Sequence, residues 1–146
     1  MGVDQSEESM YALSWAIDYL VNDNGSEELN DHIILLYAQP SSRVYVDSSA
    51  IDILESIERC QKGVTATILE KAKGICSRKK VGVEIKVVVG DPRNVICDQV
   101  DKLQVDFLVV GSRGKGSLKR ALLGSVSDYC AHRAKCPVVI VKQPKK

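Results

Sequence analysis

Aromatic residues are scarce in this chain of 146 residues, which has one Trp, one Phe and five Tyr. Its core must therefore be aliphatic, and a hydrophobic share of 45% is enough to build one. No run approaches the roughly 20 apolar residues of a membrane-spanning helix. A cationic and apolar leader is also missing, because an acid comes within four residues of Met1. We expect one intracellular domain over residues 1–146, cytoplasmic and small enough to enter the nucleus.

Cysteine pairs of the kind that bind metals are missing as well. The five cysteines are an odd number and include no C-x-x-C pair. Most stand where an apolar residue would serve, as Cys97 does after Val95 and Ile96. Buried reduced thiols are therefore expected, rather than a disulfide framework or a zinc site. A redox role for Cys130 or Cys136 is the alternative, which titration of the native thiols would test.

Residues typical of catalytic centres are equally few. His32 opens an apolar run and His132 falls in a helical pattern, where structural or exposed roles are expected before general-base catalysis. The chain contains no nucleophile elbow, no H-E-x-x-H and no Cys/His spacing of a metal site. The sequence therefore favours a binding protein over an efficient enzyme.

What the chain does contain is a regular alternation of apolar runs with amphipathic stretches. The expected strands are 1–4, which is shortened, 32–38, 81–89, 107–110 and 138–141. The expected helices follow Ser6, span about 50–78, start at Pro92, and span about 125–134. Strands separated by helices indicate repeated βαβ units, hence an α/β fold with an open doubly wound sheet and helices on both faces.

The most informative stretch joins the apolar run that ends at Gly111 to Gly124 and Ser125. Ligands of doubly wound sheets bind outside the carboxyl ends of the strands, where such a stretch would lie. Glycines let main-chain N–H groups approach a ligand, and a serine at a helix start adds a hydroxyl. The cations between the two outer glycines are Arg113, Lys115, Lys119 and Arg120. The stretch therefore predicts a site for an anion such as a phosphate.

Charge is unevenly distributed along the chain. Residues 111–146 contain nine Lys and Arg but one acid, Asp128, and carry about +8, whereas residues 1–110 carry about −7. Aromatic residues interleaved with the basic ones are missing, and so is a recognisable reading helix, which argues against nucleic acid as the partner. The basic charge is expected to attract an anionic ligand more than to contact it directly.

Two familiar nucleotide loops are excluded by their spacing. A Walker loop needs G-x-x-x-x-G-K-[ST], but here Gly116 is followed by Ser117 and Leu118. A dinucleotide fingerprint needs a third glycine that does not follow Gly114 and Gly116. What remains is the pattern Gly111-x2-Gly114-x9-Gly124-Ser125.

With this pattern the sequence resembles the universal stress protein family, in the branch that binds ATP or AMP, and its small single-domain plant members in particular. The resemblance extends over residues 3–9 (VDQSEES), 90–92 (GDP) and 106–114 (DFLVVGSRG). It implies a Rossmann-like sheet of five parallel strands in the order 3-2-1-4-5. It also implies a stress-response regulator or sensor that binds ATP or AMP.

The resemblance implies the site residues too. The residues it places at the nucleotide are Val3, Asp4, Ala38, Gly111, Ser112, Arg113, Gly114, Gly124, Ser125, Val126 and Ser127. Asp4 would face the nucleoside or hold Mg²⁺ indirectly, while a cap on the following helix is the structural alternative for it. The hydroxyls of Ser125 and Ser127 would hold phosphates.

The last apolar run, 138–141, is expected at an edge of the sheet, where an apolar strand invites pairing. The resemblance implies a homodimer through this edge. Two alternatives to a nucleotide-binding regulator stay open. One is a weak Mg²⁺-dependent ATPase or phosphotransferase, and the other is an interaction scaffold with a vestigial nucleotide pocket.

Overall fold

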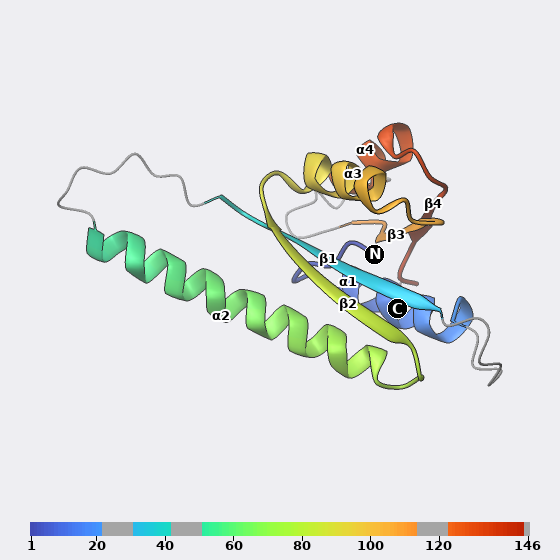
Figure 1. Ribbon diagram of the computed structural model, residues 1–146, viewed down its shortest axis with the longest axis horizontal. Coiled ribbons are helices and arrows are strands. Elements are labelled where there is room, and N and C mark those ends of the chain that lie inside the picture. Colours follow the sequence, from blue (N-terminus) through green and yellow to red (C-terminus); the bar gives the residue numbers. More distant parts are fainter. Residues whose placement is uncertain (22–30, 42–50, 114–122, 145–146) are drawn as a thin grey trace.

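The computed structural model describes residues 1–21, 31–41, 51–113 and 123–144 (Figure 1). Helices and strands alternate within these ranges. In chain order they are α1 (Glu7–Tyr19), β1 (His32–Gln39), α2 (Ile51–Cys76), β2 (Gly82–Val89), α3 (Pro92–Leu103), β3 (Leu108–Gly111), α4 (Ser125–Arg133) and β4 (Val138–Val141). The predicted alternation is confirmed, with most element ends within two residues of their expected positions. None of the described helices is both long and apolar enough to cross a membrane.

The expected helix starts at Ser6 and Pro92 are confirmed. Ser6 is the N-cap of α1, and its hydroxyl oxygen accepts a hydrogen bond of 3.1 Å from the Ser9 amide. Pro92 follows Asp91, whose carboxylate caps α3 by accepting from the Arg93 amide at 2.9 Å. Such caps satisfy amide groups that have no partner inside the helix. Local sequence signals therefore determine where these two helices begin.

The strands form two parallel pairs within the described residues. β1 pairs with β2 in a register that runs from His32–Gly82 to Gln39–Val89. β3 pairs with β4 from Leu108–Val138 to Gly111–Val141. The carboxyl ends of the strands in each pair are therefore aligned at one edge.

Residues 1–3 connect the two pairs. The Gly2 amide donates to the Val109 carbonyl of β3 at 3.1 Å, and the Val3 amide donates to the Leu36 carbonyl of β1 at 2.9 Å. The expected first strand is wrong in extent, since only an isolated parallel bridge between Gly2 and Leu36 is found there.

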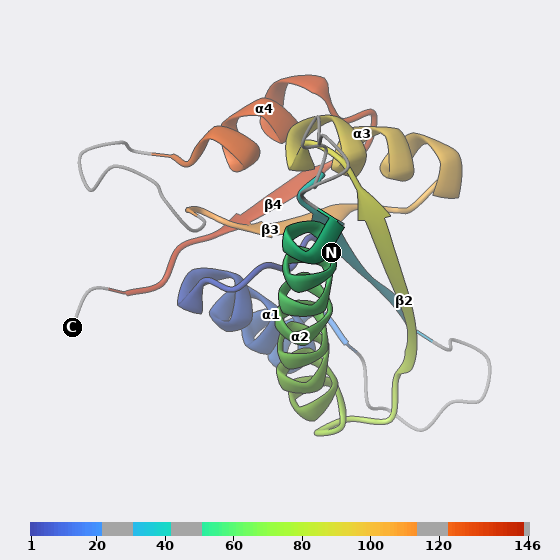
Figure 2. The same ribbon diagram turned by 90° about the vertical axis from the view of Figure 1, so that its left-hand side faces the viewer.

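The core lies on both sides of the strands, as their apolar runs predict. Leu35 is buried toward α1 and α2, with Leu13, Ile17 and Ile68. Its neighbour Leu36 is buried on the other side, toward α3 and α4. Figure 2 shows these two helix pairs on opposite sides of the strands. Each fully buried aliphatic side chain contributes about 1.5–3 kcal/mol to folding, so both layers help to fix the edge where the strands end.

Candidate functional site

The candidate site lies at the edge formed by the carboxyl ends of the strands. Asp4 follows residues 1–3 at this edge. The parallel bridge of Gly2 with Leu36 puts Asp4 in register with Ala38 of β1. Gly111 ends β3 at the same edge. The structure therefore brings together the nucleoside-side and phosphate-side segments expected from the sequence.

Asp4 is fixed by the start of α1. Its Oδ1 accepts a hydrogen bond of 2.8 Å from the Ser6 amide and a second from the Ser6 hydroxyl. The Asp4 amide donates to the Ser9 hydroxyl oxygen at 2.9 Å. Ser6, not Asp4, is thus the cap of the helix, and Asp4 orients the capping serine. The role of Ser9 could not be found from sequence, because it depends on how the chain folds back before the helix.

The Asp4 carboxylate also influences β1. Burial raises the pKa of Tyr37 from its usual value, and the negative charge of Asp4 adds to this rise. Tyr37 is 7% exposed and comes directly before Ala38, which is half-buried. The end of β1 near Asp4 is therefore a partly shielded surface, where polar groups interact more strongly than in water.

Gly111 allows β3 to end directly against the first turn of α1. A Cβ atom at this position would lie 3.1 Å from both the carbonyl carbon and the carbonyl oxygen of Glu8. It would also lie 3.2 Å from the Ser9 amide nitrogen. These neighbours are backbone atoms that cannot rotate away, so a Cβ here would press on α1, and glycine avoids this.

The two ends of the glycine-rich segment are fastened to each other. The Ser112 carbonyl accepts from the Gly124 amide at 2.7 Å and from the Ser127 hydroxyl at 2.9 Å. The Ser127 hydroxyl also lies 3.0 Å from the Gly124 carbonyl. Ser112 and Ser127 are 4% and 2% exposed. Ser127 was expected to hold a phosphate. In this structure its hydroxyl faces two carbonyl oxygens instead, and it links the two ends of the segment.

Helix α4 begins after Gly124, which has no side chain and therefore makes no side-chain cap hydrogen bond. This N-cap is in extended conformation. Ser125 is exposed and Val126 is half-buried directly after this glycine. The amides of a first helical turn carry partial positive charge, which favours an anion. This end of α4 therefore has the chemistry expected for a phosphate site.

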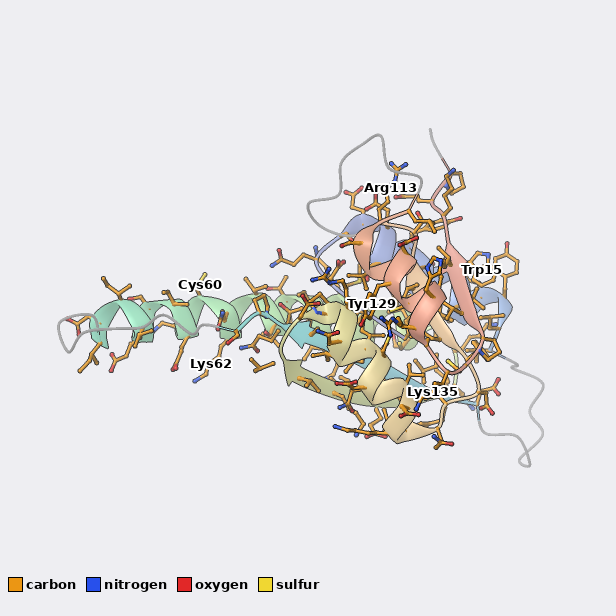
Figure 3. All side chains as sticks on the ribbon, turned by 90° about the horizontal axis from the view of Figure 1, so that it is seen from above. Trp15, Cys60, Lys62, Arg113, Tyr129 and Lys135 are labelled. Carbon is orange, nitrogen blue, oxygen red and sulfur yellow. The ribbon has the colours of Figure 1, made fainter. Side chains whose placement is uncertain are left out.

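The remaining expected site residues are placed only in part. Val3 is buried and Arg113 is half-buried, and Figure 3 shows Arg113 above α4. Gly114, Lys115, Lys119 and Arg120 lie outside the described residues. Among the residues that the structure does describe, no group of three or more acidic, His or Cys side chains could hold a metal ion.

The two histidines lie away from these segments. His32 starts β1 at the opposite end from Ala38, and its Nε2 is 3.5 Å from a Glu84 carboxylate oxygen. His132 is exposed in the last turn of α4, with its Nδ1 2.8 Å from the Asp128 carbonyl oxygen. The printed partners of both rings, Glu84 and Asp128, are not among the expected site residues.

The cysteines are all free thiols. Burial is confirmed for Cys76 and Cys130, whereas Cys97 and Cys136 are half-buried. The expectation is wrong for Cys60, which is exposed on α2 (Figure 3). Its place on the outer face of a long amphipathic helix explains the difference, because only one stripe of such a helix reaches the core.

The chain is similar to known proteins over almost its whole length. Residues 1–142 match the sequence model of the Universal stress protein family. A universal stress protein A-like protein of Arabidopsis thaliana is 33% identical over 142 residues, covering 90% of this chain and 77% of the relative. A universal stress protein of Methanocaldococcus jannaschii is 32% identical, covering 98% of this chain and 80% of the relative. In two longer Arabidopsis relatives, the matching region is 64% and 61% of the relative's length.

Solved structures share the fold. An AMP-bound universal stress protein family protein of Arabidopsis thaliana has a TM-score of 0.68 at 28% identity, covering 98% of this chain and 89% of that one. A universal stress protein in complex with cAMP has a TM-score of 0.60 at 25% identity, covering 97% of this chain and 93% of that one. UspA of Lactobacillus plantarum has a TM-score of 0.78 at 18% identity, covering 96% of this chain and 93% of that one. At this identity the likeness concerns the Rossmann-like α/β fold alone. This chain belongs to the universal stress protein family.

Proposed function

We propose that this protein binds an adenine nucleotide, ATP or AMP, and acts as a regulator or sensor in the stress response. The observation that carries the proposal is the fastened segment between β3 and α4. The bonds from Gly124 and Ser127 to the Ser112 carbonyl bring the end of a strand to the start of a helix whose N-cap is a glycine. The family members solved with AMP and with cAMP support an adenine nucleotide as the ligand.

The phosphates would lie at the first turn of α4. The amides of Ser125 and Val126 and the Ser125 hydroxyl would donate to phosphate oxygens, together with main-chain groups of Gly111 to Gly114 and of Gly124. Each hydrogen bond to a charged acceptor contributes roughly 1.5–3 kcal/mol. Ser127 would act by holding the segment closed. Arg113 would attract the anion.

The nucleoside would lie between the start of α1 and the end of β1. Asp4 Oδ1 is engaged with Ser6, so Oδ2 is the atom that we assign to a ribose hydroxyl. Main-chain groups at Ala38 would form hydrogen bonds with the adenine edge, and the buried Val3 would pack against the base. A Mg²⁺ ion would depend on the phosphates for most of its ligands, with Asp4 as an indirect one, because the described residues offer no acidic cluster of their own.

We further propose that residues 1–3 join the two strand pairs into one functional sheet, in the order β2, β1, residues 1–3, β3 and β4. The order follows from the bonds of Gly2 to β3 and of Val3 to β1. It leaves β4 at an edge, and we propose that two copies pair there as a homodimer. We place the protein in the cytoplasm.

Isothermal titration calorimetry with ATP, ADP and AMP, each with and without Mg²⁺, tests the function. We expect about one nucleotide per chain. Binding that is absent or far below this stoichiometry would favour the scaffold alternative. Release of phosphate from ATP that disappears in Asp4→Ala, while ATP still binds, would favour the ATPase alternative.

A further inference from the structure

Helices α3 and α4 meet at a pair of cysteines. The sulfur atoms of Cys97, on α3, and Cys130, on α4, are 4.0 Å apart. Cys130 is fully buried, whereas Cys97 is half-buried. Figure 2 shows the two helices side by side on one side of the strands. Cys97 is thus the more accessible residue of the pair.

The surroundings favour covalent pairing over metal binding. Cys136 lies close enough to influence the charge of both thiols, but no group of Cys, His or acidic side chains among the described residues has the arrangement of a metal site. A disulfide needs its sulfurs at about 2.05 Å, so the pair must approach by roughly 2 Å. The two helices are already in contact, so we expect side-chain rotation to bring the sulfurs together.

We propose that Cys97 and Cys130 are an oxidation site that forms a disulfide between α3 and α4 by exchange with a low-molecular-weight disulfide. In the first step the Cys97 thiolate attacks one sulfur of the small disulfide, forms a mixed disulfide and releases one small thiolate. In the second step the Cys130 sulfur attacks Cys97 and the small thiolate departs from Cys97, taking the Cys130 proton and leaving as the second small thiol. Two protein thiols are oxidised and one small disulfide is reduced to two thiols.

The environment predicts how this site behaves. Burial raises the pKa of Cys97, and it raises the pKa of Cys130 to about 12. Because the thiolate is the attacking species, exchange is expected to be slow. The same lack of thiolate stabilisation favours the uncharged disulfide over the reduced pair, so the bond is expected to resist reduction once formed. The result would be a durable oxidative link rather than a rapid switch.

Peptide mapping of the folded protein tests the proposal directly. The protein is incubated with glutathione disulfide, its remaining thiols are alkylated, and it is digested with trypsin. Cleavage after Lys and Arg places the three neighbouring cysteines in separate peptides, 94–102, 121–133 and 136–142. We expect peptides 94–102 and 121–133 to be recovered joined. Recovery of both only in alkylated or glutathione-bound form, or joined to 136–142 instead, would overturn the proposal.

Variants and a stability measurement provide the controls. Cys97→Ser is expected to abolish the link, and Cys136→Ser is expected to keep it. A link that closes a loop of this length should raise the melting temperature of the oxidised wild type by roughly 5–10 °C over the reduced form. Cys97→Ser should show no such rise. A rise of the same size in Cys97→Ser would contradict the assignment, and the peptide map of the wild type decides the matter even if a variant folds poorly.

Discussion

The hydroxyl of Ser127 lies 2.9 Å from the carbonyl oxygen of Ser112, and the two residues are 15 positions apart in the chain. Both are buried, and the same carbonyl accepts from the Gly124 amide. A single carbonyl thus holds the end of β3 against the start of α4. These contacts lie at the start of α4, where the N-cap is a glycine without a side chain. This closure makes the arrangement suitable for an anion.

Ser127→Ala should destabilise the protein by about 1 kcal/mol, because the variant loses a buried hydrogen bond. The loss is limited, since the Ser112 carbonyl keeps its bond to Gly124. Urea denaturation measures the change. Ser125→Ala is the matched control, and it should change the free energy of unfolding by less than about 0.5 kcal/mol because Ser125 is exposed. Equal destabilisation of the two variants would contradict the roles assigned to these serines.

Gly111→Ala should cost about 1–3 kcal/mol of stability, because its Cβ would press on the backbone of Glu8 and Ser9. Gly63→Ala is the control in α2, where a Cβ would meet no atom within 4 Å. That change should raise stability by up to about 1 kcal/mol, since alanine favours a helix interior over glycine. Thermal denaturation compares the two variants. A neutral Gly111→Ala would show that β3 does not approach α1 as closely as described.

Asp91 gives α3 a pH-dependent start. Hydrogen bonds from Arg93 lower the pKa of Asp91 to about 2, from an ordinary value of 3.8. Because the pKa of Asp91 is lower in the folded protein, its carboxylate contributes fully to stability above the pKa of the unfolded chain. That contribution to stability is lost as the pH falls from about 4 to about 2. Because Asp91 is exposed, we expect Asp91→Ala to cost no more than about 1 kcal/mol at pH 7. Denaturation of the wild type and of Asp91→Ala at both ends of this pH range measures the difference in stability. A difference from wild type that persists unchanged at the acidic end would refute the effect.

Val139→Lys should convert the proposed dimer into a monomer. Val139 is half-buried on β4 and packs against the cluster of Ala12 and Ala16 in α1, beside Trp15. A charged side chain at the centre of a paired edge would be desolvated without a partner. Light scattering measures the mass. Val87→Lys, at an exposed position of β2, should leave the mass unchanged. A dimer that survives Val139→Lys would argue against β4 as the interface.

Sequence patterns located the elements well where their signals are local. Ser6 and Pro92 specify helix starts through their own chemistry, and the expected run 138–141 coincides with β4. The extent of the first strand could not be predicted in this way. Residues 1–3 bond to β1 and β3, which lie far along the chain, and only the folded sheet shows how much of the segment pairs.

The candidate site was predictable in its segments but not in the direction of each side chain. Gly111, Gly124 and Ser125 form one segment in the sequence pattern, and the structure brings its two ends together. The orientation of the Ser127 hydroxyl depends on how the ends pack, which no spacing encodes. The pair of Cys97 and Cys130 depends in the same way on the contact between two helices.

AMP binding to three proteins, wild type, Ser125→Ala and Ser56→Ala, tests the central claim most directly. Ser56 is an exposed helical serine whose hydroxyl bonds to the Asp52 carbonyl of its own helix, so its variant controls for loss of a surface hydroxyl. Calorimetry should show one site in the wild type and in Ser56→Ala. Ser125→Ala should bind roughly 10-fold more weakly, which corresponds to the loss of one charge-assisted hydrogen bond. Equal affinity of all three proteins, or no binding to the wild type, would contradict a phosphate site at the start of α4.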